Sequence, residues 1–195
     1  MRQVAALGPD FFGLIFYPPS SRAVTPAQAA ALPDFAGVRR VGVFVNETIE
    51  TMLATANTAR LSFLQLHGDE TPETCAAFKQ LAPQLQVIKA FAVDAEFSGA
   101  TLADYETACD YFLFDTRSNQ RGGSGTAFDW SILQRCAIRR PFFLGGGIGP
   151  ENAPQAIAAC QGLPLFALDL NSRAETAPGV KSVTAVRKVI EVLRC

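Results

Sequence analysis

Short apolar runs rich in Phe, Val, Ile and Leu recur along this chain at fairly even intervals, and this repeat limits the possible folds most strongly. We assign a strand to each of seven runs: Phe11–Tyr17, Arg39–Val45, Phe63–His67, Gln86–Val93, Tyr111–Thr116, Pro141–Gly147 and Leu165–Asn171. Nearly continuous apolar strands are typical of a parallel sheet whose faces are covered by helices. The repeat therefore predicts an α/β fold.

Helix-like segments separate these runs. Thr25-Pro26 and Thr71-Pro72 each place an N-cap threonine before a proline at the first helical position. The last segment has apolar residues at helical spacing. We expect helices in seven segments: Thr25–Leu32, a segment from Asn46 or Glu47 to about Thr58, Thr71–Leu81, Leu102–Ala108, Asp129–Arg135, Pro150–Ala159 and Ser182–Leu193.

Polar residues or glycines stand at the end of nearly every predicted strand. Barrels and doubly wound sheets both alternate strands with helices, so alternation alone does not separate them. Barrel enzymes build their sites at the C-terminal ends of many strands, whereas a doubly wound fold gathers them near one switch point. The distribution favours a (β/α)8 barrel, or TIM barrel, formed by residues 1–195 as a single domain.

The chain is short for such a barrel, and the N-terminal part is where we expect residues to be missing. A complete barrel usually needs about 200 to 250 residues, and this chain has 195. Met1–Leu7 reads as the last two turns of a helix, with no strand before it. We therefore expect an N-terminally truncated barrel that lacks strand 1 and part of helix 1.

Composition and charge argue against several classes of protein. The net charge is −1 and no basic tract occurs, so nucleic-acid binding has little support. No apolar run reaches the roughly 18 residues that span a bilayer. Five widely spaced cysteines without a C-x-x-C pair, and a single histidine, argue against a disulfide framework or a zinc site. We expect a cytoplasmic protein without a metal, which binds neither membranes nor nucleic acid.

A glycine run follows the sixth predicted strand. Gly145–Gly147 lead into Pro150, where a helix is expected to begin, and small residues there let backbone N–H groups approach an anion. The next strand runs into Asn171 and Ser172. Phosphate sites in barrels often follow strands seven and eight, and these are the two strands if the first is missing. The pattern predicts phosphate binding; a glycine-rich turn without a ligand is the alternative.

Two aspartates end predicted strands. Asp115 closes an apolar strand, where a partly desolvated carboxyl group suits a general acid. An N-cap or a loop salt bridge is the alternative. Asp169 holds the equivalent position two strands later, and two carboxylates at two strand ends make a functional face more credible than either alone.

Three further segments contain candidate site residues. Arg22 follows the stiff loop Pro18–Ser21, where a guanidinium can clamp a carboxylate with two hydrogen bonds, although loop arginines are usually solvated. His67 ends a strand and is either a site residue or a structural histidine. Gly122–Thr126 is either a lid over the site or a linker.

Taken together, these segments resemble phosphoribosylanthranilate isomerases of tryptophan biosynthesis. Any one match alone is weak, but several in the family's order at consistent spacing are specific. The matching segments cover nearly the whole chain: Gly13–Arg22, Arg40–Asn46, Leu64–Glu70, Phe114–Thr116, Gly123–Trp130, Gly145–Asn152, Leu168–Glu175 and Ala177–Lys181.

The resemblance implies an Amadori rearrangement in an eight-stranded barrel. N-(5′-phosphoribosyl)anthranilate becomes 1-(2-carboxyphenylamino)-1-deoxyribulose 5-phosphate. A general acid protonates the furanose ring oxygen, and a general base then removes the C2′ proton from the imine. No metal or cofactor is needed, because the imine nitrogen is the electron sink. The implied partner is this phosphorylated small molecule, and the protein is expected to be a monomer or a homodimer.

The resemblance also implies roles for single residues. Asp115 matches the general acid, Arg22 the arginine that holds the anthranilate carboxylate, and His67 a histidine that lines the site. Asp169 matches a supporting aspartate. The backbone of four residues matches the phosphate cradle: Gly146, Gly147, Asn171 and Ser172. The family often has a Ser-Gly run at the last of these positions, so side-chain contacts to the phosphate are expected to differ.

The general base is where this chain departs from the family. The family opens with a strand that ends in Lys-Ile-Cys-Gly or a similar motif, and that cysteine is the base, but no such motif occurs here. A truncated enzyme is the leading interpretation, and a non-catalytic phosphosugar-binding barrel is the alternative. The Pro-Pro-Ser-Ser-Arg and Gln-Leu-His-Gly segments argue against a different phosphosugar barrel enzyme.

Overall fold

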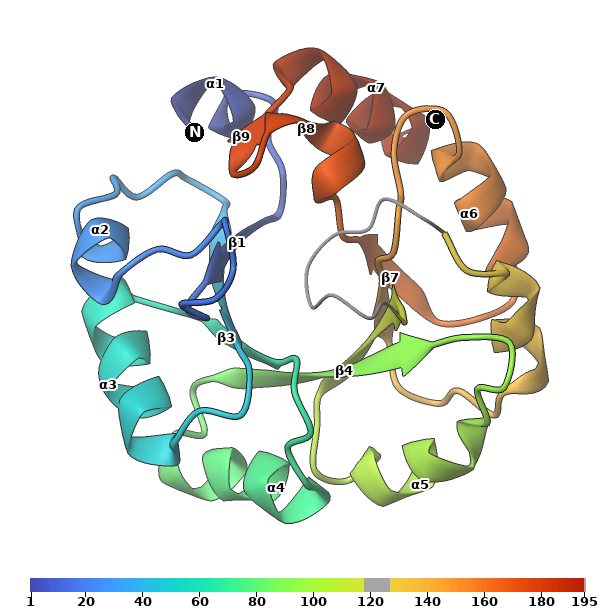
Figure 1. Cartoon of the computed structure of the whole chain (residues 1–195), viewed down its shortest axis with the longest axis horizontal. Coiled ribbons are helices and arrows are strands. Elements are labelled where there is room, and N and C mark those ends of the chain that lie inside the picture. The colour runs from blue at the N-terminus through green and yellow to red at the C-terminus, as the bar shows by residue number, and fades with distance from the viewer. Residues whose placement is uncertain (118–126, 195) are drawn as a thin grey trace. The chain divides into compact units, whose positions relative to one another are not determined.

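The computed structural model describes residues 1–117 and 127–194 (Figure 1). Gly122–Thr126, interpreted above as a lid or a linker, lies outside these residues. The chain groups into two compact units, each of which is described by itself. The β1–β4 unit consists of Gly8–Ala90 and Asp104–Tyr111, and the β5–β7 unit consists of Met1–Leu7, Phe91–Ala103 and Phe112–Cys195.

Parallel strands form the centre of the β1–β4 unit. They are β1 (Phe11–Ile15), β2 (Arg39–Phe44), β3 (Phe63–Leu66) and β4 (Gln86–Val93), of which the last three residues belong to the other unit. Phe11 pairs with Arg39, Val41 with Phe63, and Phe63 with Gln86. All four residues of β3 are buried, as expected for a strand that is covered on both sides.

Three helices cover these strands: α2 (Pro26–Ala30), α3 (Ile49–Ala59) and α4 (Pro72–Leu81) (Figure 1). Each begins after a threonine whose hydroxyl accepts a backbone N–H of the first turn. Arg40 provides hydrogen-bond donors at the C-terminal ends of α2 and α3. Its guanidinium donates to carbonyls at the ends of α2 and α3, including Ala29 at 3.1 Å and Ala59 at 2.9 Å. The last carbonyls of a helix lack partners within it, so this buried cation joins the two helices.

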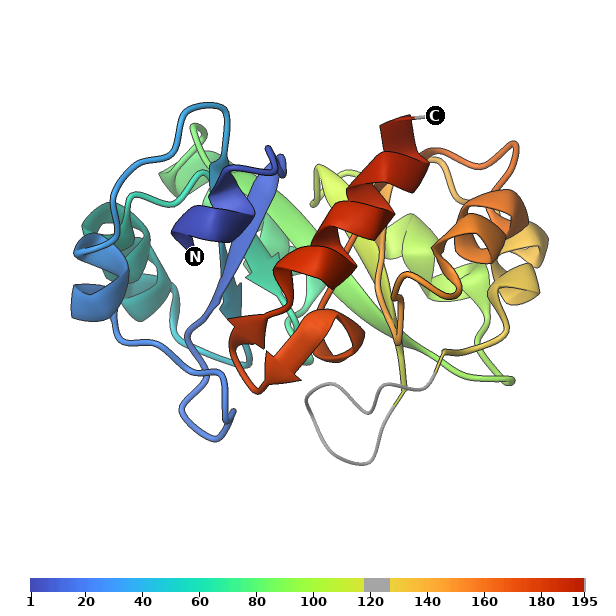
Figure 2. The same cartoon turned by 90° about the horizontal axis from the view of Figure 1, so that it is seen from above.

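The β5–β7 unit contains a second parallel group: β5 (Tyr111–Thr116), β6 (Phe142–Leu144) and β7 (Leu165–Leu168). Its remaining elements are α1 (Arg2–Ala5), η1 (Gly99–Thr101), α5 (Leu102–Tyr105), η2 (Trp130–Arg135), α6 (Ala153–Ala159), η3 (Ser172–Ala174), β8 (Glu175–Ala177), β9 (Val180–Lys181) and α7 (Val183–Arg194). The end of α5 and the first residue of β5 belong to the β1–β4 unit. Helices α1 and α7, from opposite ends of the chain, lie side by side (Figure 2).

The order of the strands in the sheet separates two classes of α/β fold. Strands β1 to β7 follow one another in chain order in one sheet, and the pairs given above are parallel. A doubly wound sheet reverses its order at a switch point, and this sheet does not. The predicted α/β class and the parallel sheet are confirmed, and the order is that of a barrel. A complete eight-stranded barrel and a missing first strand stay predictions.

Several boundaries differ from the expected ones. All seven strands are present, but five end one to three residues earlier than expected, because their polar or glycine-rich ends lie in loops. The expected helix over Asp129–Arg135 is the 3-10 helix η2, which begins after Asp129. The expected helix from Leu102 ends at Tyr105. The β8–β9 hairpin and η3 were not expected from the sequence.

Candidate functional site

Two carboxylates flank Gly145 in the β5–β7 unit. Asp115 lies near the end of β5, half-buried, and its Oδ1 accepts the N–H of Thr116 at 2.8 Å. Asp169 directly follows β7, and its N–H donates to the carbonyl of Leu144 at 2.8 Å. A Cβ atom on Gly145 would lie 3.7 Å from Asp115 Oδ1 and 3.6 Å from Asp169 Oδ2. The ends of three strands thus bring these two predicted site residues to one place.

Gly146 and Gly147 turn the chain sharply beside Asp115. Their φ angles are +79° and +64°, in the left-handed region that favours glycine. A Cβ on Gly146 would overlap the hydroxyl of Thr116 and lie 3.2 Å from Asp115 Oδ1. Asn152 closes the loop, because its side chain donates to the carbonyl of Gly147 at 2.9 Å and accepts from the N–H of Gly149 at 2.8 Å. The backbone at Gly146 therefore packs directly against the strand that carries Asp115.

Asn171 and Ser172, the other predicted cradle residues, begin the turn η3. Lys181 from β9 donates to Asn171 Oδ1 at 2.9 Å and to Glu175 Oε1 at 2.9 Å. The side chain of Glu175 is only 4% exposed. Lys181 carries no distinctive signal in the sequence, although it ends one of the segments that resemble the family. Its ammonium places a positive charge beside the predicted phosphate cradle.

Arg22 belongs to the β1–β4 unit, in the compact loop that follows β1. The N–H of Arg22 donates to Ser20 Oγ at 3.2 Å, and the N–H of Ser20 donates to the carbonyl of Tyr17 at 2.9 Å. The chain then returns beside its own strand, where the N–H of Val24 donates to the carbonyl of Ile15 at 2.9 Å. Arg22 is half-buried, and these hydrogen bonds fix the course of the backbone that carries it.

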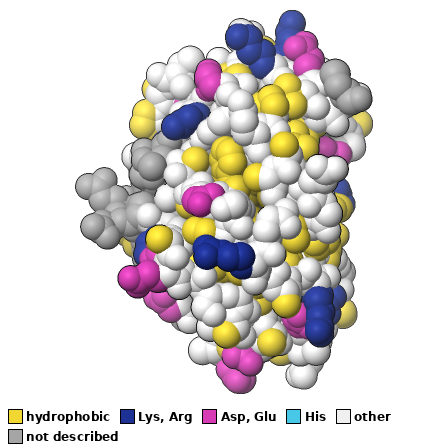
Figure 3. All heavy atoms as spheres, turned by 90° about the vertical axis from the view of Figure 1, so that its right-hand side faces the viewer, with side chains coloured by type: hydrophobic (Ala, Val, Ile, Leu, Met, Phe, Trp, Pro, Cys, Tyr) yellow, Lys and Arg dark blue, Asp and Glu magenta, His cyan; other side chains and the backbone are white. Residues whose placement is uncertain are grey.

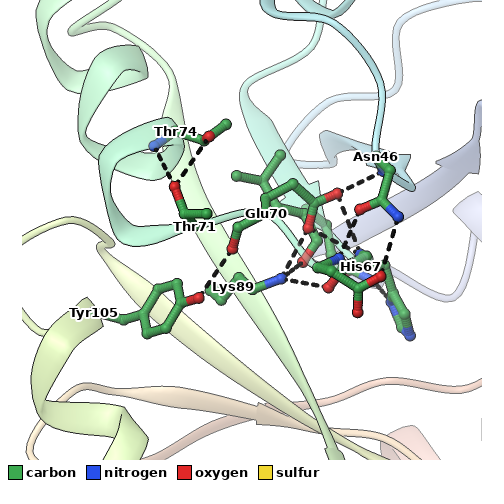
Figure 4. A network of polar contacts seen from close by, with 11 residues as sticks. Asn46, His67, Glu70, Thr71, Thr74, Lys89 and Tyr105 are labelled. Carbon is green, nitrogen blue, oxygen red and sulfur yellow. Dashed lines mark hydrogen bonds and ion pairs between the residues drawn. The ribbon is translucent and has the colours of Figure 1, made fainter.

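His67 directly follows β3 in the same unit. Its Nδ1 lies 2.8 Å from Nε2 of Gln65, a residue that is 6% exposed. Lys89 from β4 donates to the carbonyls on either side of the histidine, Leu66 at 3.3 Å and Gly68 at 2.7 Å (Figure 4). Sequence reasoning identified His67 but not the side chains that hold it.

Glu70 completes this network as the partner of Lys89. Its Oε2 lies 2.8 Å from Lys89 Nζ, and its carboxylate also accepts the N–H groups of Asn46 and Gly68. Asn46 adopts a φ of +51° and its side chain accepts the N–H of Asp69 at 2.7 Å. The loops after β2 and β3 are therefore joined through one buried carboxylate (Figure 4).

The described cysteines all lie away from the C-terminal ends of strands. Cys75 lies within α4, Cys109 precedes β5, and Cys136 and Cys160 follow η2 and α6. Burial raises the pKa of Cys136, and it raises the pKa of Cys160 to about 11. A hydrogen bond with Cys75, followed by burial, raises the pKa of Cys109. Cys75 is fully buried within its helix, so none of the four is placed as a strand-end base.

Three findings concern metal binding, membrane-spanning helices and the distribution of surface charge. Among residues 1–117 and 127–194, no cluster of three or more His, Cys, Asp or Glu side chains is arranged to hold a metal ion. None of the helices in this same part of the chain has the length and apolar character to cross a membrane. On the face shown in Figure 3, Lys and Arg side chains are interspersed with Asp and Glu rather than gathered.

Comparison with known proteins identifies relatives along nearly the full chain. Residues 2–192 match the family described as N-(5′-phosphoribosyl)anthranilate (PRA) isomerase. A protein of that name from Parabacteroides distasonis is 42% identical over 194 residues, which cover 98% of this chain and 86% of that protein.

Solved structures agree with the sequence relatives. The crystal structure of phosphoribosyl anthranilate isomerase from Thermus thermophilus has a TM-score of 0.83 and 34% identity, over 99% of this chain and 92% of that one. Another phosphoribosyl anthranilate isomerase, in complex with reduced 1-(o-carboxyphenylamino)-1-deoxyribulose 5-phosphate, has a TM-score of 0.73 and 33% identity. That match covers 99% of this chain and 91% of the other.

Proposed function

Because this chain belongs to the N-(5′-phosphoribosyl)anthranilate isomerase family, it is an isomerase of tryptophan biosynthesis, and we propose how its own residues carry out the reaction. The substrate is N-(5′-phosphoribosyl)anthranilate, and the product is 1-(2-carboxyphenylamino)-1-deoxyribulose 5-phosphate. The arrangement of Asp115 and Asp169 about Gly145 is the observation that carries the assignment of roles.

Asp115 acts as the general acid. It lies at a strand end, it is half-buried, and its carboxyl group stands beside the glycine turn that leads into the predicted phosphate cradle. In its protonated form it delivers a proton to the furanose ring oxygen, so the C1′–O bond breaks and the anthranilate nitrogen becomes a protonated imine. Asp169 supports this step as the second carboxylate beside Gly145. Proton transfer of this kind contributes about 10²–10⁴-fold to a rate.

The other predicted site residues bind the two ends of the substrate. Backbone N–H groups of four residues hold the phosphate: Gly146, Gly147, Asn171 and Ser172. Arg22 pairs with the anthranilate carboxylate, for which a guanidinium offers two parallel donors. His67 lines the site. No residue in this set calls for a metal or a cofactor, because the imine nitrogen itself accepts the electron pair.

In this proposal, the general base is a cysteine on a further strand ahead of β1. The four described cysteines lie in or beside helices or before a strand, so none of them stands at the C-terminal end of a strand. The family's base stands at the end of the first barrel strand, so a further strand ahead of β1 would carry it and complete a (β/α)8 barrel. The continuous family match supports one domain over residues 1–195. A cytoplasmic location and a monomeric or dimeric state stay predictions.

Separate measurements of binding and of turnover test the role of Asp115 as the general acid. In a chain extended ahead of Met1 by a segment that ends in Lys-Ile-Cys-Gly, the Asp115→Asn variant is expected to keep its affinity for the reduced product analogue in calorimetry and to lose about 10²–10⁴-fold in turnover. Asp104→Asn, an exposed position on α5, is the matched control and should change neither. Near-normal turnover of Asp115→Asn would remove Asp115 from the role.

The base is tested by adding a segment that ends in Lys-Ile-Cys-Gly ahead of Met1. Turnover should rise with this segment and fall again when only its cysteine is changed to serine. If the chain binds the analogue but never turns over substrate, with or without the segment, the function is that of a phosphosugar-binding barrel instead.

A further inference from the structure

We infer that Gln65 holds His67 as the neutral Nε2–H tautomer, which makes His67 a hydrogen-bond donor to the substrate rather than a base. The contact with the substrate rests on the function proposed above, whereas the tautomer does not. Gln65 belongs to β3, its side chain is almost fully buried, and its Nε2 lies 2.8 Å from His67 Nδ1. The pair therefore sits on a rigid element instead of a loop.

The chemistry of the two nitrogens decides the tautomer. An amide nitrogen carries two hydrogens and accepts no hydrogen bond, so Nδ1 of the neutral ring must be the acceptor in this contact. A neutral imidazole has a single N–H, which is then on Nε2. Because Nδ1 is engaged and Nε2 already carries its hydrogen, neither nitrogen is set to remove the C2′ proton. His67 is thus excluded as a replacement for the family's cysteine base.

The backbone of His67 is fixed as well as its ring. Lys89 donates to the carbonyls of Leu66 and Gly68, the two neighbours of the histidine, and Glu70 accepts the N–H of Gly68 at 2.9 Å (Figure 4). A side chain whose backbone and ring are both held loses little freedom when it binds a ligand. Gln65, Lys89 and Glu70 are accordingly positioning residues for His67. The donor at Nε2 suits an anionic or hydroxyl oxygen of the phosphorylated substrate.

The protein offers a direct test, because it contains one histidine. In the untagged chain, a long-range ¹H–¹⁵N correlation spectrum therefore shows a single imidazole. In alkaline buffer the spectrum should show a protonated Nε2 and an unprotonated Nδ1. Gln65→Glu should move the proton from Nε2 to Nδ1, since a carboxylate accepts a hydrogen bond from Nδ1–H. Gln80→Glu, which makes the same charge change at an exposed position of α4, should leave the spectrum unchanged.

Each outcome bears on a separate part of the inference. A protonated Nδ1 in the unsubstituted chain overturns the tautomer, and this measurement needs neither a variant nor a ligand. A tautomer that stays the same in a folded Gln65→Glu variant overturns the role of Gln65. With the reduced product analogue as the probe, reversal should weaken binding about 10-fold, as expected for one lost hydrogen bond. Unchanged affinity with a reversed tautomer would overturn the donor role, whatever the outcome for Asp115.

Discussion

Lys89 and Glu70 form an ion pair whose two side chains are only 4% and 3% exposed, with Lys89 Nζ 2.8 Å from Glu70 Oε2. Each charge also has backbone partners: the ammonium donates to two carbonyls, and the carboxylate accepts from two N–H groups. Burying two charges is costly, and a pair of this kind is tolerated only when such extra hydrogen bonds are present. The pair therefore fixes the geometry of the loops that it joins.

Replacement of Lys89 by methionine should destabilise the protein strongly. The change leaves Glu70 buried without its counter-charge, which typically costs about 3–5 kcal/mol. Urea unfolding measures the loss. Arg117→Met provides the control, because Arg117 pairs with Asp94 at 3.0 Å with its own side chain 63% exposed. Exposed pairs contribute about 0–1 kcal/mol, so equal losses in the two variants would contradict a special role for the buried pair.

Gly146→Ala should disturb the β6 loop by contact with Thr116. Both Gly146 and Gly162 have a φ near +80°, but a Cβ on Gly146 would overlap Thr116, whereas a Cβ on Gly162 meets nothing within 4 Å. Gly162→Ala should therefore cost only the left-handed strain of about 1–2 kcal/mol. Gly146→Ala should cost more in urea unfolding and should also weaken binding of the reduced product analogue. Equal stability and affinity in the two variants would argue against the close packing.

Lys181→Met should weaken binding of the phosphorylated ligand. The change removes the donor that holds Asn171 Oδ1 and the partner of the buried Glu175 carboxylate. Hydrogen bonds to charged groups contribute about 1.5–3 kcal/mol, so an increase in Kd of about 10-fold or more is expected in calorimetry. The exposed Lys188 of α7 is the control position, where methionine should leave Kd unchanged. An unaltered Kd in Lys181→Met would separate this lysine from the cradle.

Stability should fall at alkaline pH, partly because of Cys160. Burial raises the pKa of this thiol from an ordinary value near 9 to about 11. Between these values the unfolded chain has lost the proton that the folded chain keeps, so the free energy of unfolding decreases as pH rises. The contribution is intact below about pH 9 and is lost toward pH 11. Each pKa unit corresponds to about 1.4 kcal/mol.

Urea unfolding of the Cys160→Ala variant isolates this contribution. Between about pH 8 and pH 10.5 the variant should lose about 1–2 kcal/mol less than the unsubstituted chain, because it lacks the titrating thiol. Parallel losses in the two proteins would show that other groups account for the whole alkaline fall.

The sequence predicts the elements with strong local signals. Thr25 and Thr71 cap the helices that they were expected to cap, and all seven apolar runs are strands. The β8–β9 hairpin lacked such a signal, since strands of three and two residues show no periodicity. The 3-10 form of η2 was missed because apolar spacing does not reveal whether a short helix bonds to the third or the fourth residue.

Contacts between distant residues explain what the sequence did not predict at the site. Glu70 meets Lys89 only because the register of β3 and β4 pairs Leu66 with Lys89. Lys181 reaches Asn171 only through the hairpin turn. Both lysines are ordinary in the sequence, and their importance arises from pairing geometry. Residues at strand ends, such as Asp115 and Asp169, were predictable because their position along the chain already places them.

The packing of α1 against α7 has a consequence for synthesis on the ribosome. Helix α1 (Arg2–Ala5) is synthesised before α7 (Val183–Arg194), against which it packs. At about 5–20 residues per second, the first helix must wait on the order of ten seconds or longer for its partner. Through that interval α1 lacks α7 as a packing partner and is open to chaperones and proteases. The residues of the β1–β4 unit extend only to Tyr111, so all of them are synthesised well before α7.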